Sequence, residues 1–190
     1  MMYLEDGIQW STRFTNTILL SEKIWPNDTQ VTLHLSPKSD DADLQNITFE
    51  KYKYCFIKIL QNSIFIGNNE KDYNTFKKYS NFVIDFPVRP VDQMVGTCLF
   101  AKLNAIGGDV LKVDGLQIES WQGENLRFNI TEDSPEWDFV SYEKNHWWND
   151  AEPNFSNFKK DRLTWKEIGF TITNSKSHLT VIEGKKNERE

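Results

Sequence analysis

Cysteine is scarce in this chain, and so are the signals that direct a protein to a membrane or out of the cell. The 190 residues include two cysteines, Cys55 and Cys98, each inside an apolar stretch. Such surroundings are typical of buried free thiols, and two thiols exclude a framework of several disulfides. Residues 1–6 are acidic where a secretory signal would be basic, and no apolar run approaches the roughly 18 residues of a membrane span. We therefore expect a cytoplasmic protein with no membrane partner.

Sequence motifs of the common enzyme classes are also missing. The chain has no glycine-rich phosphate loop, no dinucleotide-binding fingerprint, no His-Glu-x-x-His, no Cys-x-x-Cys and no Gly-x-Ser-x-Gly. Histidine, the usual general base near neutral pH, occurs three times, at positions 34, 146 and 178. These absences argue against nucleotide-binding, zinc and serine-hydrolase classes, and we expect no cofactor and no metal site.

Positive charge is in the minority. The chain carries 22 basic and 28 acidic side chains, which give a formal net charge of −6. A negative field repels the phosphates of nucleic acids unless a basic stripe overrides it. We therefore expect no nucleic-acid partner, and the charge favours another protein with a basic surface.

Apolar and aromatic residues, in contrast, are plentiful. Hydrophobic residues make up 38% of the chain, which includes 7 Trp, 6 Tyr and 13 Phe. A chain of this length buries well over half of its unfolded surface in one core. We find no internal repeat and no low-complexity segment. The sequence therefore predicts a single domain over residues 1–190, with a charged, frayed C-terminal tail at about 184–190.

The clearest predicted element is an amphipathic helix at about 90–106. Pro90 suits a first helical position, and Gly107 and Gly108 follow the last apolar residue. Apolar residues recur every three or four positions between them: Val91, Met94, Val95, Cys98, Leu99, Leu103 and Ile106. Gly96 lowers helix propensity in the middle of this segment, which indicates close packing there. This helix should be the centre of the core.

The predicted fold class is α+β, a mostly antiparallel sheet or meander packed on the central helix, with one or two further helices. Residues 29–35 alternate apolar and polar side chains as a half-buried strand does. Further predicted strands are 63–66, 81–86, 110–113, 116–121, 126–130, 165–173 and 178–182, and further helices are 49–60 and 70–79. Asp114-Gly115 is a hairpin signal between two of these strands. The sheet residues expected to face the helix stripe Val91, Val95, Leu99, Leu103 and Ile106 are Leu33, Val113, Ile118, Phe128 and Phe170.

Residues 131–152, which we call the acidic aromatic segment, are the most unusual in composition. Seven acidic residues and one lysine give the segment the same net charge, −6, as the whole chain. Aromatic residues lie between the acids, an arrangement found both in packed loops and in binding surfaces. The first interpretation has the aromatics covering an edge of the core with solvated acids between them. In the second, the binding surface consists of Glu136, Trp137, Asp138, Tyr142, Trp147, Trp148 and Asp150.

Three functions remain open at this point. The first is a non-catalytic protein-binding module of the inhibitor, immunity or phage/host accessory type, whose carboxylates steer a basic partner and whose aromatic residues anchor it. The second is a small hydrolase or transferase with a carboxylate and histidine site in an aromatic-lined pocket. His146 is the best catalytic candidate because two tryptophans follow it and Asp150 lies near it in the sequence. The third is a structural subunit of a larger assembly.

Overall fold

The computed structural model of this chain describes residues 7–21, 23–79, 82–135, 137, 140 and 146–153. The chain divides into two compact units, residues 1–160 and 161–190, and all of the described residues belong to the first. Predicted strands 165–173 and 178–182, Phe170 and the tail at 184–190 lie outside the described residues. The single domain over residues 1–190 therefore stays a prediction.

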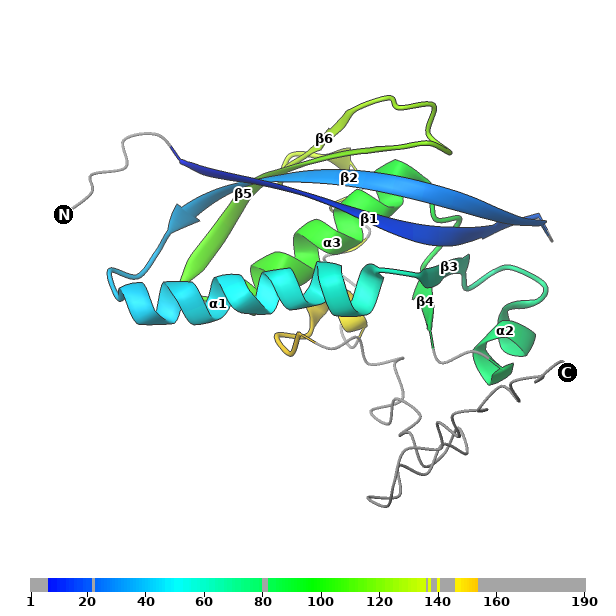
Figure 1. Cartoon of the computed structure of the whole chain (residues 1–190), viewed down its shortest axis with the longest axis horizontal. Helices are drawn as coiled ribbons and strands as arrows, with labels where there is room; N and C mark the ends of the chain where they lie inside the picture. The colour runs from blue at the N-terminus through cyan, green and yellow to red at the C-terminus, as the bar shows by residue number, and fades with distance from the viewer. Residues whose placement is uncertain are drawn as a thin grey trace, which may run out of the picture. The chain divides into compact units, whose positions relative to one another are not determined.

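A six-stranded mixed sheet forms the framework of the first unit, in the order β4-β3-β1-β2-β5-β6 (Figure 1). The strands are β1 (Ile8–Leu20), β2 (Lys23–Pro37), β3 (Ser63–Gly67), β4 (Val83–Phe86), β5 (Leu111–Ser120) and β6 (Phe128–Ile130). The pairs β1–β2, β2–β5 and β5–β6 are antiparallel, whereas β1–β3 and β3–β4 are parallel. A helix connects β3 to β4 and returns the chain in the same direction, whereas β3 runs opposite to β2 and is therefore parallel to β1. The predicted α+β class is confirmed.

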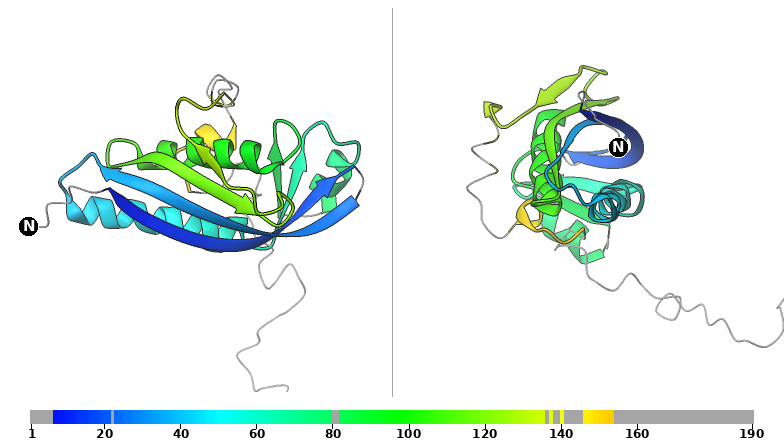
Figure 2. Two further views of the ribbon diagram at one scale, coloured as in Figure 1. Left: turned by 90° about the horizontal axis from the view of Figure 1, so that it is seen from above. Right: turned by 90° about the vertical axis from the view of Figure 1, so that its left-hand side faces the viewer.

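One face of this sheet carries α1 (Ala42–Tyr54), which continues as the π-helix η1 (Cys55–Leu60), together with α3 (Asp92–Gly107) and the 3-10 helix η2 (Trp147–Asn149). The short helix α2 (Tyr73–Tyr79) lies on the opposite face, where Tyr73 and Phe76 pack against Leu19, Ile66 and Val83. Trp10 of β1 packs edge-on against Phe49 of α1, and α3 packs on β5 and β6 on the same side of the sheet (Figure 2). None of these helices, in the part of the chain that is described, is long and apolar enough to cross a membrane.

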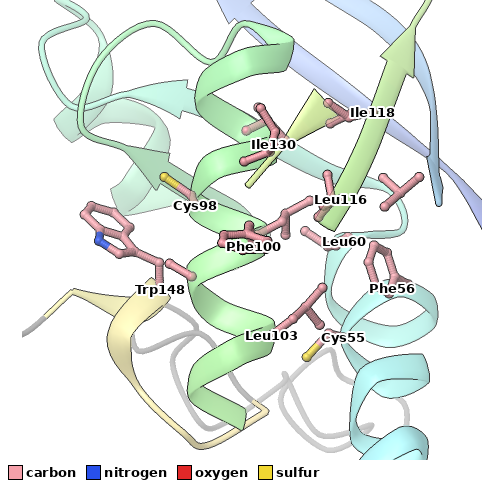
Figure 3. Packing of buried hydrophobic residues seen from close by; sticks show 14 of the residues in the cluster. Cys55, Phe56, Leu60, Cys98, Phe100, Leu103, Leu116, Ile118, Ile130 and Trp148 are labelled. Carbon is pink, nitrogen blue, oxygen red and sulfur yellow. The ribbon is translucent and has the colours of Figure 1, made fainter. Parts of the chain in front are cut away.

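The predicted central helix is confirmed as α3. Its residues Val95, Leu99, Leu103 and Ile106 are buried in the core together with Leu33, Val113 and Ile118 of the sheet, and Phe128 is half-buried against them. Figure 3 shows Ile118 and Ile130 beside this helix. A Cβ atom added to Gly96 would lie 2.9 Å from a side-chain carbon of each of these isoleucines, which explains the glycine. The expected burial of Val91 is wrong, because Val91 precedes the helix as its N-cap and is 44% exposed.

The hairpin predicted at Asp114-Gly115 is also wrong. Both residues lie inside the continuous strand β5, where Gly115 pairs with His34 and Val113 pairs with Leu35. Asp114 is therefore the extra residue of a β-bulge, a feature that bends and twists a strand without ending it. The chain reverses instead at residues 121–126, between β5 and β6.

Candidate functional site

The acidic aromatic segment does not present its two adjacent tryptophans to solvent. Trp147 and Trp148 are each only 1% exposed, so they lack the exposed surface that the binding interpretation of this segment requires of them. The Trp147 indole Nε1 donates to the Asp85 carbonyl oxygen at 2.7 Å, and its ring meets Phe86 edge-on at 5.6 Å. The Trp148 Nε1 donates to the Val140 carbonyl oxygen at 3.2 Å, and Figure 3 shows this side chain beside α3. For this pair, the interpretation in which aromatics cover the core holds.

Other members of the predicted surface also have internal partners. Trp137 is half-buried and meets Phe100 of α3 edge-on at 5.2 Å. The Asp150 carboxylate accepts a hydrogen bond from the Glu152 backbone N–H at 3.0 Å, and the Asp150 carbonyl oxygen accepts one from Lys102 at 2.8 Å. Glu136, Asp138 and Tyr142 lie outside the residues whose side chains are described.

His146, the best catalytic candidate by sequence, packs flat on Trp148. The two ring centroids are 4.4 Å apart and the rings are within 5° of parallel. This stacking fixes the plane of the imidazole parallel to the buried Trp148 indole. His146 itself is half-buried. In the described part of the chain, no three His, Cys, Asp or Glu side chains come together as metal ligands.

A buried lysine and a buried thiol hold the end of the described segment. Lys102 and Cys55 are almost completely buried, and the Cys55 Sγ donates to the Pro153 carbonyl oxygen at 3.2 Å. Burial lowers the pKa of Lys102 to about 8, and burial raises the pKa of the Cys55 thiol to about 12. Both groups donate to backbone carbonyls of residues 150–153, so their role here is to hold this segment against the core.

A different site lies at the N-terminal end of α3. A cavity of about 280 Å³, which we call the α3 pocket, opens there between the helix, the end of β1 and the turn after β5. Its residues are Ile18, Leu20, Pro90, Val91, Asp92, Gln93, Gln122, Gly123, Glu124, Leu126 and Phe128. The walls are mostly apolar, and the charged residues among them, Asp92 and Glu124, are both acidic. The pocket therefore combines apolar walls with negative charge.

Four large exposed apolar side chains belong to the segments that form the α3 pocket, and two of them, Val91 and Leu126, line it. Trp121 is 61% exposed, Leu126 60%, Val91 44% and Trp25 42%, and we call these four residues the hairpin-end surface. Trp25 pairs across the β1–β2 ladder with Ile18, which lines the pocket. Large exposed apolar side chains that gather at one place are unusual for a surface that meets only water.

Hydrogen bonds join the elements that carry this surface. The Gln122 Nε2 donates to the Pro26 carbonyl oxygen at 3.0 Å, the Gln122 backbone N–H donates to the Asn27 Oδ1 at 3.0 Å, and the Trp121 backbone N–H donates to the Asp28 carbonyl oxygen at 3.1 Å. The turn after β5 is thus fixed to the end of the β1–β2 hairpin, which keeps Trp25 and Trp121 in one region of the molecule.

A layer of buried polar side chains lies beneath the pocket, on the face of the sheet that α3 covers. Thr29 donates its hydroxyl to the Asn16 Oδ1 at 3.0 Å and accepts from the Asn27 Nδ2 at 3.2 Å. Ser120, which pairs with Thr29 across the β2–β5 ladder, donates to the Asp92 Oδ1 at 2.7 Å. All five side chains are buried. Aliphatic residues normally occupy such buried positions, whereas here polar side chains occupy them and hydrogen-bond to one another.

Two atoms of this layer have no hydrogen-bond partner among the described residues, the Asn16 Nδ2 and the Asp92 Oδ2. An unpaired buried polar group is costly, so such groups concentrate where a ligand or water completes them. Asp92 is 5% exposed, and burial raises the pKa of its carboxyl above the ordinary value while hydrogen bonding by Ser120 opposes the rise. A Cβ atom at Gly123 would lie 2.1 Å from the Asp92 Oδ2, so only glycine leaves room for the carboxylate.

The turn that covers Asp92 has an unusual backbone. Glu124 and Asn125 have φ angles of 55° and 56°, in the left-handed region that glycine and asparagine tolerate best. The Leu126 N–H donates to the Gly123 carbonyl oxygen at 2.9 Å and closes the turn around these two residues. A glutamate in this conformation costs on the order of 1 kcal/mol relative to a glycine. The chain nevertheless has a glutamate here, and this residue lines the pocket.

A second group of exposed apolar residues lies on the outer side of α1 and η1: Leu44, Ile47, Tyr54 and Ile57. An open groove of about 510 Å³ runs beside them and includes Pro153. Every residue that lines this groove is exposed or half-buried, so no buried polar group contributes to it. The α3 pocket differs because a buried carboxylate with an unpaired oxygen forms part of its wall.

No protein-family model and no curated protein matches this chain. A crystal structure of an uncharacterized protein from Wolinella succinogenes is similar over 67% of this chain and 98% of its own, with 11% identity and a TM-score of 0.45. A 6-pyruvoyltetrahydropterin synthase from Plasmodium vivax, solved with a catalytic residue mutated, is similar over 66% of this chain and 98% of its own, with 8% identity and a TM-score of 0.36. Similarity at this level supports no inference about function, so the function rests on the residues of this chain.

Proposed function

We propose that this protein is a non-catalytic protein-binding module whose partner docks on the hairpin-end surface. The observation that carries the proposal is the exposure of Trp25, Val91, Trp121 and Leu126 on the segments that form a pocket whose charged residues are acidic. Tryptophan is the residue type most enriched among interface anchors, and a central pocket is where such anchors concentrate binding energy. We thus assign the binding role to the hairpin-end surface and not to the acidic aromatic segment.

The partner that fits this surface is a protein with a basic patch. The chain has a net charge of −6, and Asp92 and Glu124 give the pocket its local negative charge. Opposite charge at an interface accelerates the encounter, whereas apolar contacts determine mainly how long the complex lasts. The two kinds of residue should therefore affect different rate constants.

Surface plasmon resonance with the partner isolated from cells that carry the gene tests the proposal. We expect Trp121→Ala and Leu126→Ala to raise the dissociation rate constant about tenfold or more, since the loss of an interface anchor costs more than about 1.4 kcal/mol. Ile47→Ala is the matched control, because Ile47 is 55% exposed but lies on α1. Equal rate constants for wild type and all three variants would remove the hairpin-end surface as the docking site.

A further inference from the structure

We propose that the α3 pocket receives one cationic side chain of the partner, a lysine or an arginine, whose charged group hydrogen-bonds to Asp92. This inference rests on the proposed binding function and names the chemistry that the pocket recognises. It assigns to Asp92 the role of the buried acceptor and to Glu124 that of a second negative charge beside the bound group.

The composition of the pocket walls matches an amphipathic cation. Ile18, Leu20 and Phe128 supply apolar contacts from the sheet, and Leu126 supplies them from the turn. Lysine and arginine have aliphatic stems that pack on such surfaces and charged ends that need hydrogen-bond acceptors. A neutral apolar side chain would leave the carboxylates without a partner, and an anionic one would be repelled by them.

Asp92 is the acceptor because its Oδ2 is buried, has no hydrogen-bond partner among the described residues and belongs to a residue of the pocket wall. Ser120 holds the other carboxylate oxygen at 2.7 Å and so fixes the orientation of the group. A hydrogen bond between ionised partners is stronger than one between neutral groups, particularly where water is excluded. A cation thus completes the one acceptor that the fold leaves open here.

Binding should include a shift of the turn at residues 121–126. Gly123 covers the Asp92 Oδ2 so closely that a Cβ atom there would lie 2.1 Å from it, and a bound cation reaches this oxygen when the turn moves outward. The left-handed backbone of Glu124 and Asn125 is a conformation that such a movement can relax. The amides of these turn residues therefore report on the pocket directly.

NMR titration of the isotopically labelled full chain with N-acetyl-arginine amide and N-acetyl-lysine amide tests the proposal without a partner protein. N-acetyl-citrulline amide, which has nearly the shape of the arginine derivative but no charge, is the matched probe. We expect the cationic probes to bind with millimolar affinity, to shift the amide signals of Gly123, Glu124 and Asn125, and to bind about tenfold or more tightly than the citrulline probe.

Two variants and one control separate the pocket from general acidity. Asp92→Asn should weaken binding of the arginine probe about tenfold or more, Glu124→Gln should weaken it less, and Asp114→Asn, an exposed acid in the bulge of β5, should leave it unchanged. Equal binding of the arginine and citrulline probes, shifts away from the turn, or an unchanged affinity in Asp92→Asn would overturn the proposal. If the pocket fails these tests while Trp121→Ala still releases the partner, the docking surface stands and only the cationic side chain is wrong.

Discussion

Replacement of the buried carboxylate of Asp92 by an amide should stabilise the fold while it removes the recognition of a cation. Asp92→Asn keeps the shape of the side chain and an oxygen that accepts from Ser120. A buried acceptor without a partner costs about 1–3 kcal/mol, and more when it is charged. Against this stands the attraction of the carboxylate to the N-terminus of α3, about 0.3–1 kcal/mol. Because the amide nitrogen also lacks a partner, we expect a net gain of about 1 kcal/mol at pH 7.

The pH dependence of this gain follows from the direction of the pKa shift. The folded protein raises the pKa of Asp92, so just above the ordinary Asp pKa the folded chain holds a proton that the unfolded chain has released. The stability provided by Asp92 is therefore full below the ordinary pKa and is lost as the pH rises through the folded pKa. Urea denaturation of wild type and Asp92→Asn between pH 7 and pH 3.8 should show a gain that shrinks on acidification. A variant less stable than wild type by more than about 1 kcal/mol, with a parallel pH profile, would refute this reasoning.

Two further predictions concern the core. Leu99→Ala should lower the free energy of unfolding by about 2–5 kcal/mol in chemical denaturation. Leu126→Ala, at the exposed turn, should change this free energy by less than about 0.5 kcal/mol. Equal effects of the two substitutions would mean that Leu99 is not a core residue. Lys102→Met should abolish a gain in stability that the wild type shows between about pH 8 and pH 10.5, because in this window the unfolded chain binds a proton that the folded chain has released. Persistence of that gain in the variant would assign it to another group.

Much of the fold could be predicted from the sequence, because periodic patterns report which side of an element is buried. The stripe of α3 and the alternation of residues 29–35 both specified their elements correctly. The parallel pairing of β3 could not be read in this way, since it depends on the helical connection and on long-range contacts. At Asp114-Gly115 the local signal misled, because the same residue pair suits a bulge within a strand as well as a turn between two strands.

The site was much harder to predict than the fold. Asp92 follows Pro90 in the first turn of a helix, where an acidic residue is ordinary, so nothing in the sequence shows that its carboxylate is buried. Trp121 and Gly123 were visible as a strand end and a turn, but the attachment of this turn to the end of the β1–β2 hairpin results from the register of three strands. The tryptophans at 147 and 148 misled for the opposite reason, because an acidic neighbourhood suggested exposure whereas their indole N–H groups found backbone acceptors inside the core.

Site-specific photo-crosslinking tests the docking surface most directly. A photoreactive phenylalanine analogue is placed at position 126 on the turn after β5 or at position 47 on the outer side of α1, two positions with similar exposure. After irradiation in cells that carry the gene, we predict that the chain substituted at Leu126 crosslinks to one protein with a basic surface, and that Trp121→Ala in the same chain greatly reduces this product. A crosslink to the same protein from Ile47 alone would contradict the proposed surface and place docking on α1.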